Sequence, residues 1–210
     1  MMMRYRILAS IATVIAMSCT GCGEDEPPRG AAAMNGACDG VLDGEVVKQA
    51  KRSNDFSRIY NSSASEESHA AASKTMLTED HVVYVCRLVV DDGSKSGNDA
   101  LWIRFTPGLD PLFPGEQDRS YGFFDAYKLG SGMQATNKSR STDIFFPCVR
   151  NEQSAPLSVT GTLFNDLNIS TEVRFRTLFN SAAKMAHFLK CTNTIKFPPP
   201  EAMKPLPKNY

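Results

Sequence analysis

The chain has 210 residues, and its 23 Lys and Arg residues balance 23 Asp and Glu residues, so the formal net charge is zero. This balance argues against a basic surface for nucleic acid, and the 42% apolar content is that of a globular protein rather than a disordered one. The length favours a single domain with one substantial core.

The first 21 residues have the order of a secretory signal peptide. Arg4 and Arg6 supply a positive start, and the apolar run over 7–17 is closed by small residues. A membrane-spanning helix needs roughly 20 apolar residues, so this run is too short to hold the chain in a bilayer. We therefore expect residues 1–21 to direct export.

The end of this signal resembles a bacterial lipobox, in which a small residue precedes a cysteine that is acylated. The sequence Thr-Gly-Cys at 20–22 matches the last three positions of a lipobox that ends at Cys22. The sequence Ala-Met-Ser-Cys at 16–19 offers a second lipobox that ends at Cys19, but its Met is less suitable in the second position. Acylation of Cys22 leaves an even set of four cysteines in the exported chain, whereas acylation of Cys19 leaves Cys22 as an unpaired thiol. We expect a palmitate-type lipid on Cys22, which would hold the protein at the extracytoplasmic face of the cell membrane. A secreted chain without lipid is the remaining alternative.

Residues 22–37 are acidic at first and then rich in Pro, Gly and Ala, without apolar periodicity. This composition predicts a flexible tether between the lipid and the domain. We expect the globular domain to cover residues 38–197 and a Pro-rich tail, 198–210, to run extended over its surface.

The domain opens with a predicted short helix within 42–53, for which Asp43 is the N-cap. A short strand is predicted within 55–63. A second helix is predicted over 65–79, where Ser65 is suited to cap an acidic first turn and an alanine run.

Residues 80–92 form the clearest predicted strand. Strict alternation puts Tyr84 and Cys86 on the same face, and both faces are apolar, so we expect a central strand covered on both sides. A polar loop leads to a second strand over 100–107, and the two strands are predicted to form a hairpin.

The long stretch 107–142 is rich in Gly, Pro, Asp and Ser, and no element is predicted there. Strands are predicted at 142–150 and 155–165. The strongest helical pattern follows over 170–191, with Ser170 or Thr171 as the cap and a continuous apolar face. Helices around a strand-rich middle predict an α+β domain, with an antiparallel sheet and helices packed on it.

The four cysteines of the exported domain allow three disulfide pairings. We favour Cys38 with Cys86, which ties the start of the domain to its central strand. Cys148 then pairs with Cys191, which joins a strand to the end of the last helix. A zinc site is disfavoured because the domain lacks closely spaced cysteine pairs.

Three histidines are the natural candidates for catalysis or metal binding. His81 is adjacent to Asp80 and Glu79, which could orient it as a general base, but no nucleophile accompanies it. His69 follows Glu66 by three residues and could share a helix face with it as a metal-ligand pair, but an exposed helix turn is the favoured interpretation.

His187 is interpreted as a favourable charge near the end of the last helix. The loop 91–99 contains acidic residues and glycines, but its spacing is not that of a calcium loop. We therefore predict no catalytic residue, no metal site and no cofactor.

The letters CDGVL at Cys38, a strand cysteine at Cys86, FFPC at Cys148 and AHFLKC at Cys191 resemble a group of uncharacterised secreted or lipid-anchored proteins of actinomycetes such as Streptomyces. The resemblance covers most of residues 38–191. It implies a location at the cell surface and no particular activity.

These observations favour a cell-envelope lipoprotein with a non-enzymatic binding domain. The expected partners are the membrane, through the N-terminal lipid, and an envelope protein, a wall component or a small ligand, but not nucleic acid. The alternative is a hydrolase-like envelope enzyme that uses His81 with Asp80 or Glu79. A purely structural envelope protein is a third possibility.

Overall fold

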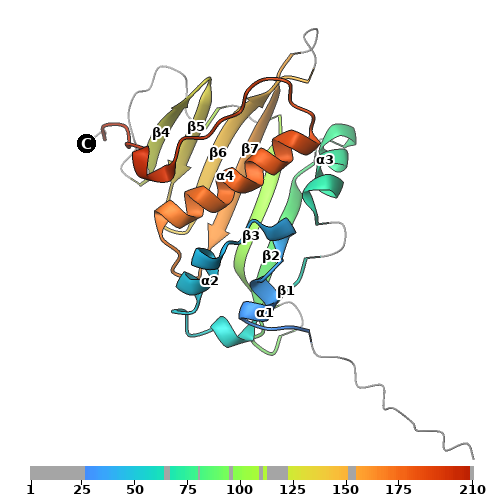
Figure 1. Ribbon diagram of the computed structural model, residues 1–210, viewed down its shortest axis with the longest axis vertical. Coiled ribbons are helices and arrows are strands. Elements are labelled where there is room, and N and C mark those ends of the chain that lie inside the picture. The colour runs from blue at the N-terminus through green and yellow to red at the C-terminus, as the bar shows by residue number, and fades with distance from the viewer. Residues whose placement is uncertain are drawn as a thin grey trace, which may run out of the picture.

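The computed structural model describes residues 27–63, 67–79, 81–94, 97–108, 111–112, 123–150 and 155–208. They form an antiparallel sheet of seven strands in the order β1-β2-β3-β7-β6-β5-β4. Helix α4 crosses one face of this sheet, with α2 and α3 beside it (Figure 1). The strands are β1 (Ile59–Asn61), β2 (Val83–Val90), β3 (Asn98–Pro107), β4 (Asp125–Gly130), β5 (Met133–Asn137), β6 (Ser141–Cys148) and β7 (Leu157–Asn165), and the helices are α1 (Ala31–Met34), α2 (Gly44–Ala50), α3 (His69–Thr78) and α4 (Thr171–Phe188). The predicted α+β architecture is confirmed.

The folded domain begins earlier than the sequence indicates. Arg29 pairs with Asp91 at 2.8 Å, and the Gly30 amide donates to the Ile59 carbonyl at 2.8 Å. Helix α1 follows, and its Met34 is fully buried in the core. The prediction of a flexible tether up to residue 37 is therefore wrong from Arg29 onwards, because this segment packs beside β1.

Side-chain caps mark the starts of three helices. The Asp43 carboxylate accepts from two amides of the first turn of α2, and the Ser170 hydroxyl accepts from the Val173 amide of α4, as predicted. Helix α3 begins later than predicted, because Ser68 rather than Ser65 is its N-cap. Ser65 itself lies outside the described residues.

The predicted hairpin of β2 and β3 is present, but β2 does not alternate strictly. A bulge between Tyr84 and Cys86 lets Tyr84 pair with Arg104 on the outer face of the sheet, while Cys86 pairs with Ile103 on the face beneath α4. The expectation that Tyr84 and Cys86 share a face is therefore wrong. Since Tyr84 is 37% exposed, the outer face of β2 is also not fully covered.

A second hairpin, β4 and β5, lies in the stretch where no element was predicted. Its turn is Gly130-Ser131-Gly132, and all three residues have positive φ, which glycine adopts without steric cost. The hairpin forms the edge of the sheet beside β6.

The core lies between the sheet and α4. The entire predicted apolar face of this helix is buried: Val173, Phe175, Leu178, Phe179, Ala182, Ala186 and Leu189. Gly161 in β7 lets the helix-facing side chains of the neighbouring strands meet, because a Cβ there would lie 2.7 Å from the Phe105 ring and 3.2 Å from Ile144. In the part of the chain that the structure describes, no helix combines the length and the apolar character required to cross a membrane.

Candidate functional site

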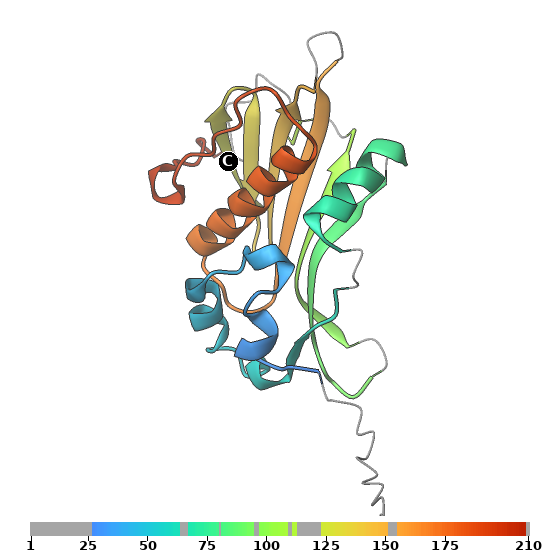
Figure 2. The same ribbon diagram turned by 45° about the vertical axis from the view of Figure 1, so that its right-hand side comes forward.

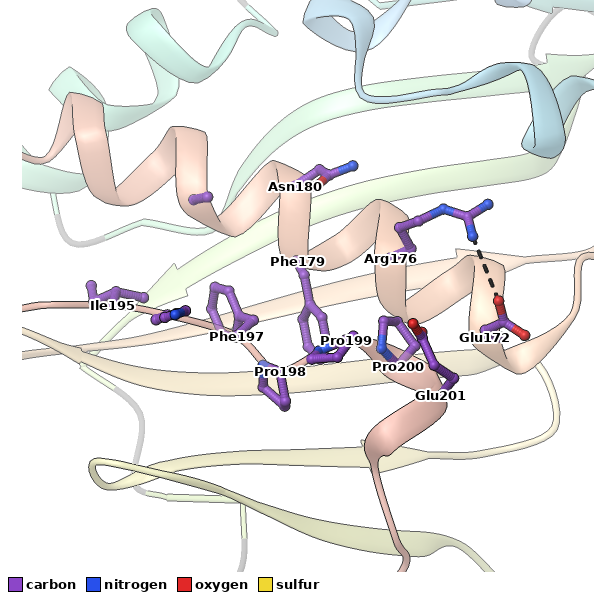
Figure 3. A pocket seen from close by; sticks show the side chains of 12 residues that line it. Glu172, Arg176, Phe179, Asn180, Ile195, Phe197, Pro198, Pro199, Pro200 and Glu201 are labelled. Carbon is purple, nitrogen blue, oxygen red and sulfur yellow. Dashed lines mark ion pairs between the residues drawn. The ribbon is translucent and has the colours of Figure 1, made fainter.

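The chain that follows α4, residues 191–206, is here called the C-terminal segment. An open groove of about 700 Å³ runs between α4 and this segment, and we call it the α4 groove (Figure 3). Residues from Glu172 to Ala183 line it on the helix side, over a length of about 17 Å at 1.5 Å per residue. Residues 195–201 line the opposite side. The complete lining is Glu172, Arg176, Phe179, Asn180, Ala183, Ile195, Lys196, Phe197, Pro198, Pro199, Pro200 and Glu201.

The C-terminal segment is fastened at both ends of the groove. Where it leaves α4, the Cys148–Cys191 disulfide joins it to β6, and the Asn193 side chain makes hydrogen bonds of 2.7 and 2.9 Å to backbone groups that flank Cys148. Beyond the groove, the Leu206 amide donates to the Ala126 carbonyl of β4 at 2.8 Å. Residues 198–201 of the predicted tail therefore belong to a fixed wall of the groove. Contrary to the prediction, the tail is not extended throughout, because Pro200–Ala202 form a 3₁₀ helix.

The floor of the groove is aromatic. Phe179 points from α4 toward the segment, where it stacks on Phe197 with ring centroids 4.7 Å apart and planes at 5° (Figure 3). Phe197 also forms a T-shaped contact with Phe146 of β6, with ring centroids 6.1 Å apart. This stack presents apolar surface whose position is set by the core.

The rim of the groove carries charges of both signs. Arg176 bonds to the Asp43 carboxylate at 3.0 Å and lies 3.6 Å from Glu172, and Glu201 and Lys196 are exposed on the opposite wall. Burial alone would raise the pKa of Asp43, but hydrogen bonds from the α2 amides and from Arg176 outweigh it and hold this pKa below its usual value. Asp43 is therefore ionised at neutral pH and fixes Arg176 beside the groove.

The lining of the α4 groove combines charged and apolar side chains. The groove contains two carboxylates, two cations, one amide and apolar side chains, but its lining includes no His, Cys, Ser or Thr. The hydroxyl or thiol nucleophile and the imidazole base of a Ser-His or Cys-His pair are therefore not among these residues.

A second constellation lies between α3, α4 and the 3₁₀ turn Cys38–Gly40, with His69 and Ser181 buried and Asp39 exposed. His69 Nδ1 lies 2.7 Å from the Asp39 carboxylate, and His69 Nε2 lies 2.7 Å from the Ser181 hydroxyl. The backbone amide of His69 also donates to Asp39 at 2.9 Å, and Lys184 donates to the Asp39 carbonyl. The three side chains thus have the contacts of a Ser-His-Asp triad.

Burial determines the protonation state of this cluster. It lowers the pKa of His69 and outweighs the opposing effect of Asp39. The pKa of Asp39 is lowered as well, because hydrogen bonds from His69 exceed the effect of its own partial burial. The imidazole is therefore neutral, with Nδ1–H donating to Asp39 and Nε2 accepting from Ser181.

The surroundings of Ser181 do not permit triad chemistry. Both Ser181 and His69 are fully buried, and neither lines the α4 groove. Ser181 lies inside α4, where the neighbouring amides are bonded within the helix and cannot act as an oxyanion hole. The cluster instead ties α3 to α4 and to the start of the domain.

The three histidines differ in exposure: His69 is buried, whereas His81 and His187 are exposed. His69 was expected on an exposed helix turn, and this prediction is wrong because α3 begins at His69 and directs it toward α4. Glu66, its suggested partner, lies outside the described residues. His187 is exposed in the last turn of α4.

His81 is exposed before β2, and its Nδ1 contacts the Glu79 backbone carbonyl rather than a carboxylate. Asp80 lies outside the described residues. Within the described part of the chain, no hydrogen bond joins His81 to a nucleophile.

The remaining sequence candidates are cysteines and metal ligands. Cys38 is bonded to Cys86 and Cys148 to Cys191, the same two pairs that the sequence favours. Among the described residues, no group of three or more His, Cys, Asp or Glu side chains is placed to hold a metal ion. Cys19 and Cys22 lie outside the described residues.

The outer face of the sheet carries a row of aromatic rings and arginines. Trp102 stacks on Phe164 at 5.4 Å and meets the edge of Tyr84 at 5.9 Å. The Arg104 guanidinium lies 4.8 Å from the centre of the Trp102 ring, and that of Arg140 lies 5.1 Å from the centre of Phe164. The faces of these rings therefore contact one another and the arginines. Neither family models, nor curated proteins, nor solved structures show a significant match to this chain.

Proposed function

We propose that this protein is a bacterial cell-envelope lipoprotein, anchored through acylated Cys22, whose α4 groove binds an extended peptide segment of another envelope protein without catalysing a reaction. The anchor is supported by the signal and the TGC letters that end at Cys22. Two disulfides in the domain are typical of proteins outside the reducing cytosol.

The observation that carries the binding role is the shape of the α4 groove. Its helix wall is about 17 Å long, which is the length of roughly five residues of extended chain. The aromatic floor gives apolar side chains a site, and the rim offers both signs of charge. Because both walls are fastened to the core, little ordering accompanies binding.

The anchor is tested by the intact mass of the full chain, extracted with detergent from a bacterium that processes lipoproteins. We expect the mature chain to begin at Cys22 and to carry an acyl group. Cys22→Ser should prevent this modification, while the matched variant Cys19→Ser should retain it. A mature chain that begins at Cys19, or that carries no lipid, would refute the anchor.

The groove is tested with displayed random peptides of about 12 residues, selected on the folded domain. We expect selected peptides to combine apolar and charged residues, and Ala183→Trp to weaken their binding at least tenfold by filling the groove. His187→Trp alters an exposed position of the same helix outside the groove and should leave binding unchanged. Failure to select peptides, or equal binding by both variants, would refute the binding role.

A further inference from the structure

We propose that the lipid anchor keeps one end of the domain toward the bilayer, the end that carries α1, the last residue of β2 and the first residue of β3. The proposal rests on the acylation of Cys22 proposed above.

The place where the domain meets its anchor is fixed by three contacts. Arg29 forms a β-bridge with Tyr60 and an ion pair with Asp91, which directly follows β2. The next residue, Gly30, donates to the carbonyl of Ile59. Figure 1 shows this region, beside α1 and β1, at the lower end of the long axis of the molecule. Arg29 is therefore a rigid part of that end.

The connection from this point to the lipid is short. Only six residues, 23–28, separate Cys22 from Arg29. At about 3.6 Å per residue, seven Cα-to-Cα steps reach at most about 25 Å even when fully extended. Any chain conformation keeps Arg29 within this distance of Cys22.

The domain is longer than this reach. Strand β3 starts at the α1 end, where Asn98 pairs with Val90, and continues to Pro107 at the opposite end. Its ten residues span about 30 Å at 3.3 Å per step. An inverted domain would hold Arg29 at least this far from the bilayer, beyond the reach of the connection. A fully inverted orientation, with β3 along the bilayer normal, is therefore excluded.

This orientation decides which surfaces face the aqueous space. Helix α3 lies at the end opposite α1 (Figure 1, Figure 2). The C-terminal segment that forms one wall of the α4 groove also lies in this upper half. The short connection thus presents the groove to partners away from the membrane.

The orientation is tested by energy transfer from tryptophan to dansyl-labelled lipid in vesicles of phosphatidylcholine and phosphatidylglycerol that carry the acylated full chain. The natural Trp102 is first removed by Trp102→Phe. Lys51→Trp then places a donor at the C-cap of α2, and Lys74→Trp places one on α3; both replace exposed lysines. We expect several-fold more transfer for Lys51→Trp than for Lys74→Trp.

A lengthened connection provides the control. Insertion of about 20 Gly and Ser residues after Glu26 extends the reach beyond the length of the domain and should bring the two transfer values close together. Equal or reversed transfer with the natural connection overturns the orientation, and so does a ratio that the insertion leaves unchanged. Flotation and intact mass identify the separate case of a chain without acylation, which overturns the anchor and the orientation together.

Discussion

Replacement of Ser181 by Ala tests whether the Asp39–His69–Ser181 cluster stabilises the fold. The change removes the hydroxyl 2.7 Å from His69 Nε2 and leaves this nitrogen buried without a partner. An unsatisfied buried polar atom costs about 1–3 kcal/mol. We expect the free energy of unfolding at neutral pH to fall by this amount.

The matched control is Ser73→Ala. Ser73 is also buried in a helix, but its hydroxyl donates only to the Ala70 carbonyl of the same helix at 2.9 Å. Loss of this local bond leaves no partner in another element unsatisfied, so we expect a smaller effect. Urea unfolding, followed by the fluorescence of Trp102, measures both variants. Equal losses for Ser181→Ala and Ser73→Ala would refute the role of the cluster.

The pH dependence of stability tests the same cluster. Burial lowers the pKa of His69 below its usual value of 6.5, so at slightly acidic pH the unfolded chain binds a proton that the folded chain does not. This contribution to stability is complete above about pH 6.5 and is lost as the pH falls toward the folded pKa. The lowered pKa of Asp39 adds a second loss below its usual value of 3.8. His69→Gln should remove the first loss, and an unchanged profile in this variant would contradict the assignment.

Two further predictions concern packing and crosslinks. Gly161→Ala should destabilise the domain by about 1–3 kcal/mol, because the new Cβ would lie 2.7 Å from the buried Phe105 ring. Gly44→Ala, which meets no atom within 4 Å at the start of α2, should be neutral in the same urea titration. The double variant Cys148→Ser/Cys191→Ser should lower the free energy of unfolding by about 4 kcal/mol in the chain-entropy model for a separation of 43 residues, and should also weaken peptide binding in the groove. Unchanged stability of the double variant would show that this crosslink adds nothing to the fold.

Local sequence patterns were sufficient to predict the elements that are determined by interactions between residues close in the sequence. Asp43 and Ser170 cap their helices through bonds to amides two or three residues away, and such caps are visible in a sequence. The apolar spacing of α4 likewise identified its buried face. The two disulfides of the structure are the favoured pairs because each joins elements that local patterns had already located.

Other elements depend on contacts that have no local pattern. Residues 29–37 look like a tether, but β1 and the core give Met34 a site. The β4–β5 hairpin follows a long polar stretch, and its Gly130-Ser131-Gly132 turn was the available indication that the chain reverses there. The bulge in β2 arises from its pairing with β3. A prediction from the alternation of side chains along one strand cannot include such a bulge.

The sequence by itself predicted the α+β class and most helices and strands, because these follow from composition, spacing and capping. The proposals of export and of acylation at Cys22 rest on the sequence alone. Only the tertiary structure decided where function can reside. His69 and Ser181 are 112 residues apart in the chain, and their bond exists because α3 packs on α4. Both walls of the α4 groove are close in sequence, but the groove forms because β4 and β6 hold the C-terminal segment in place.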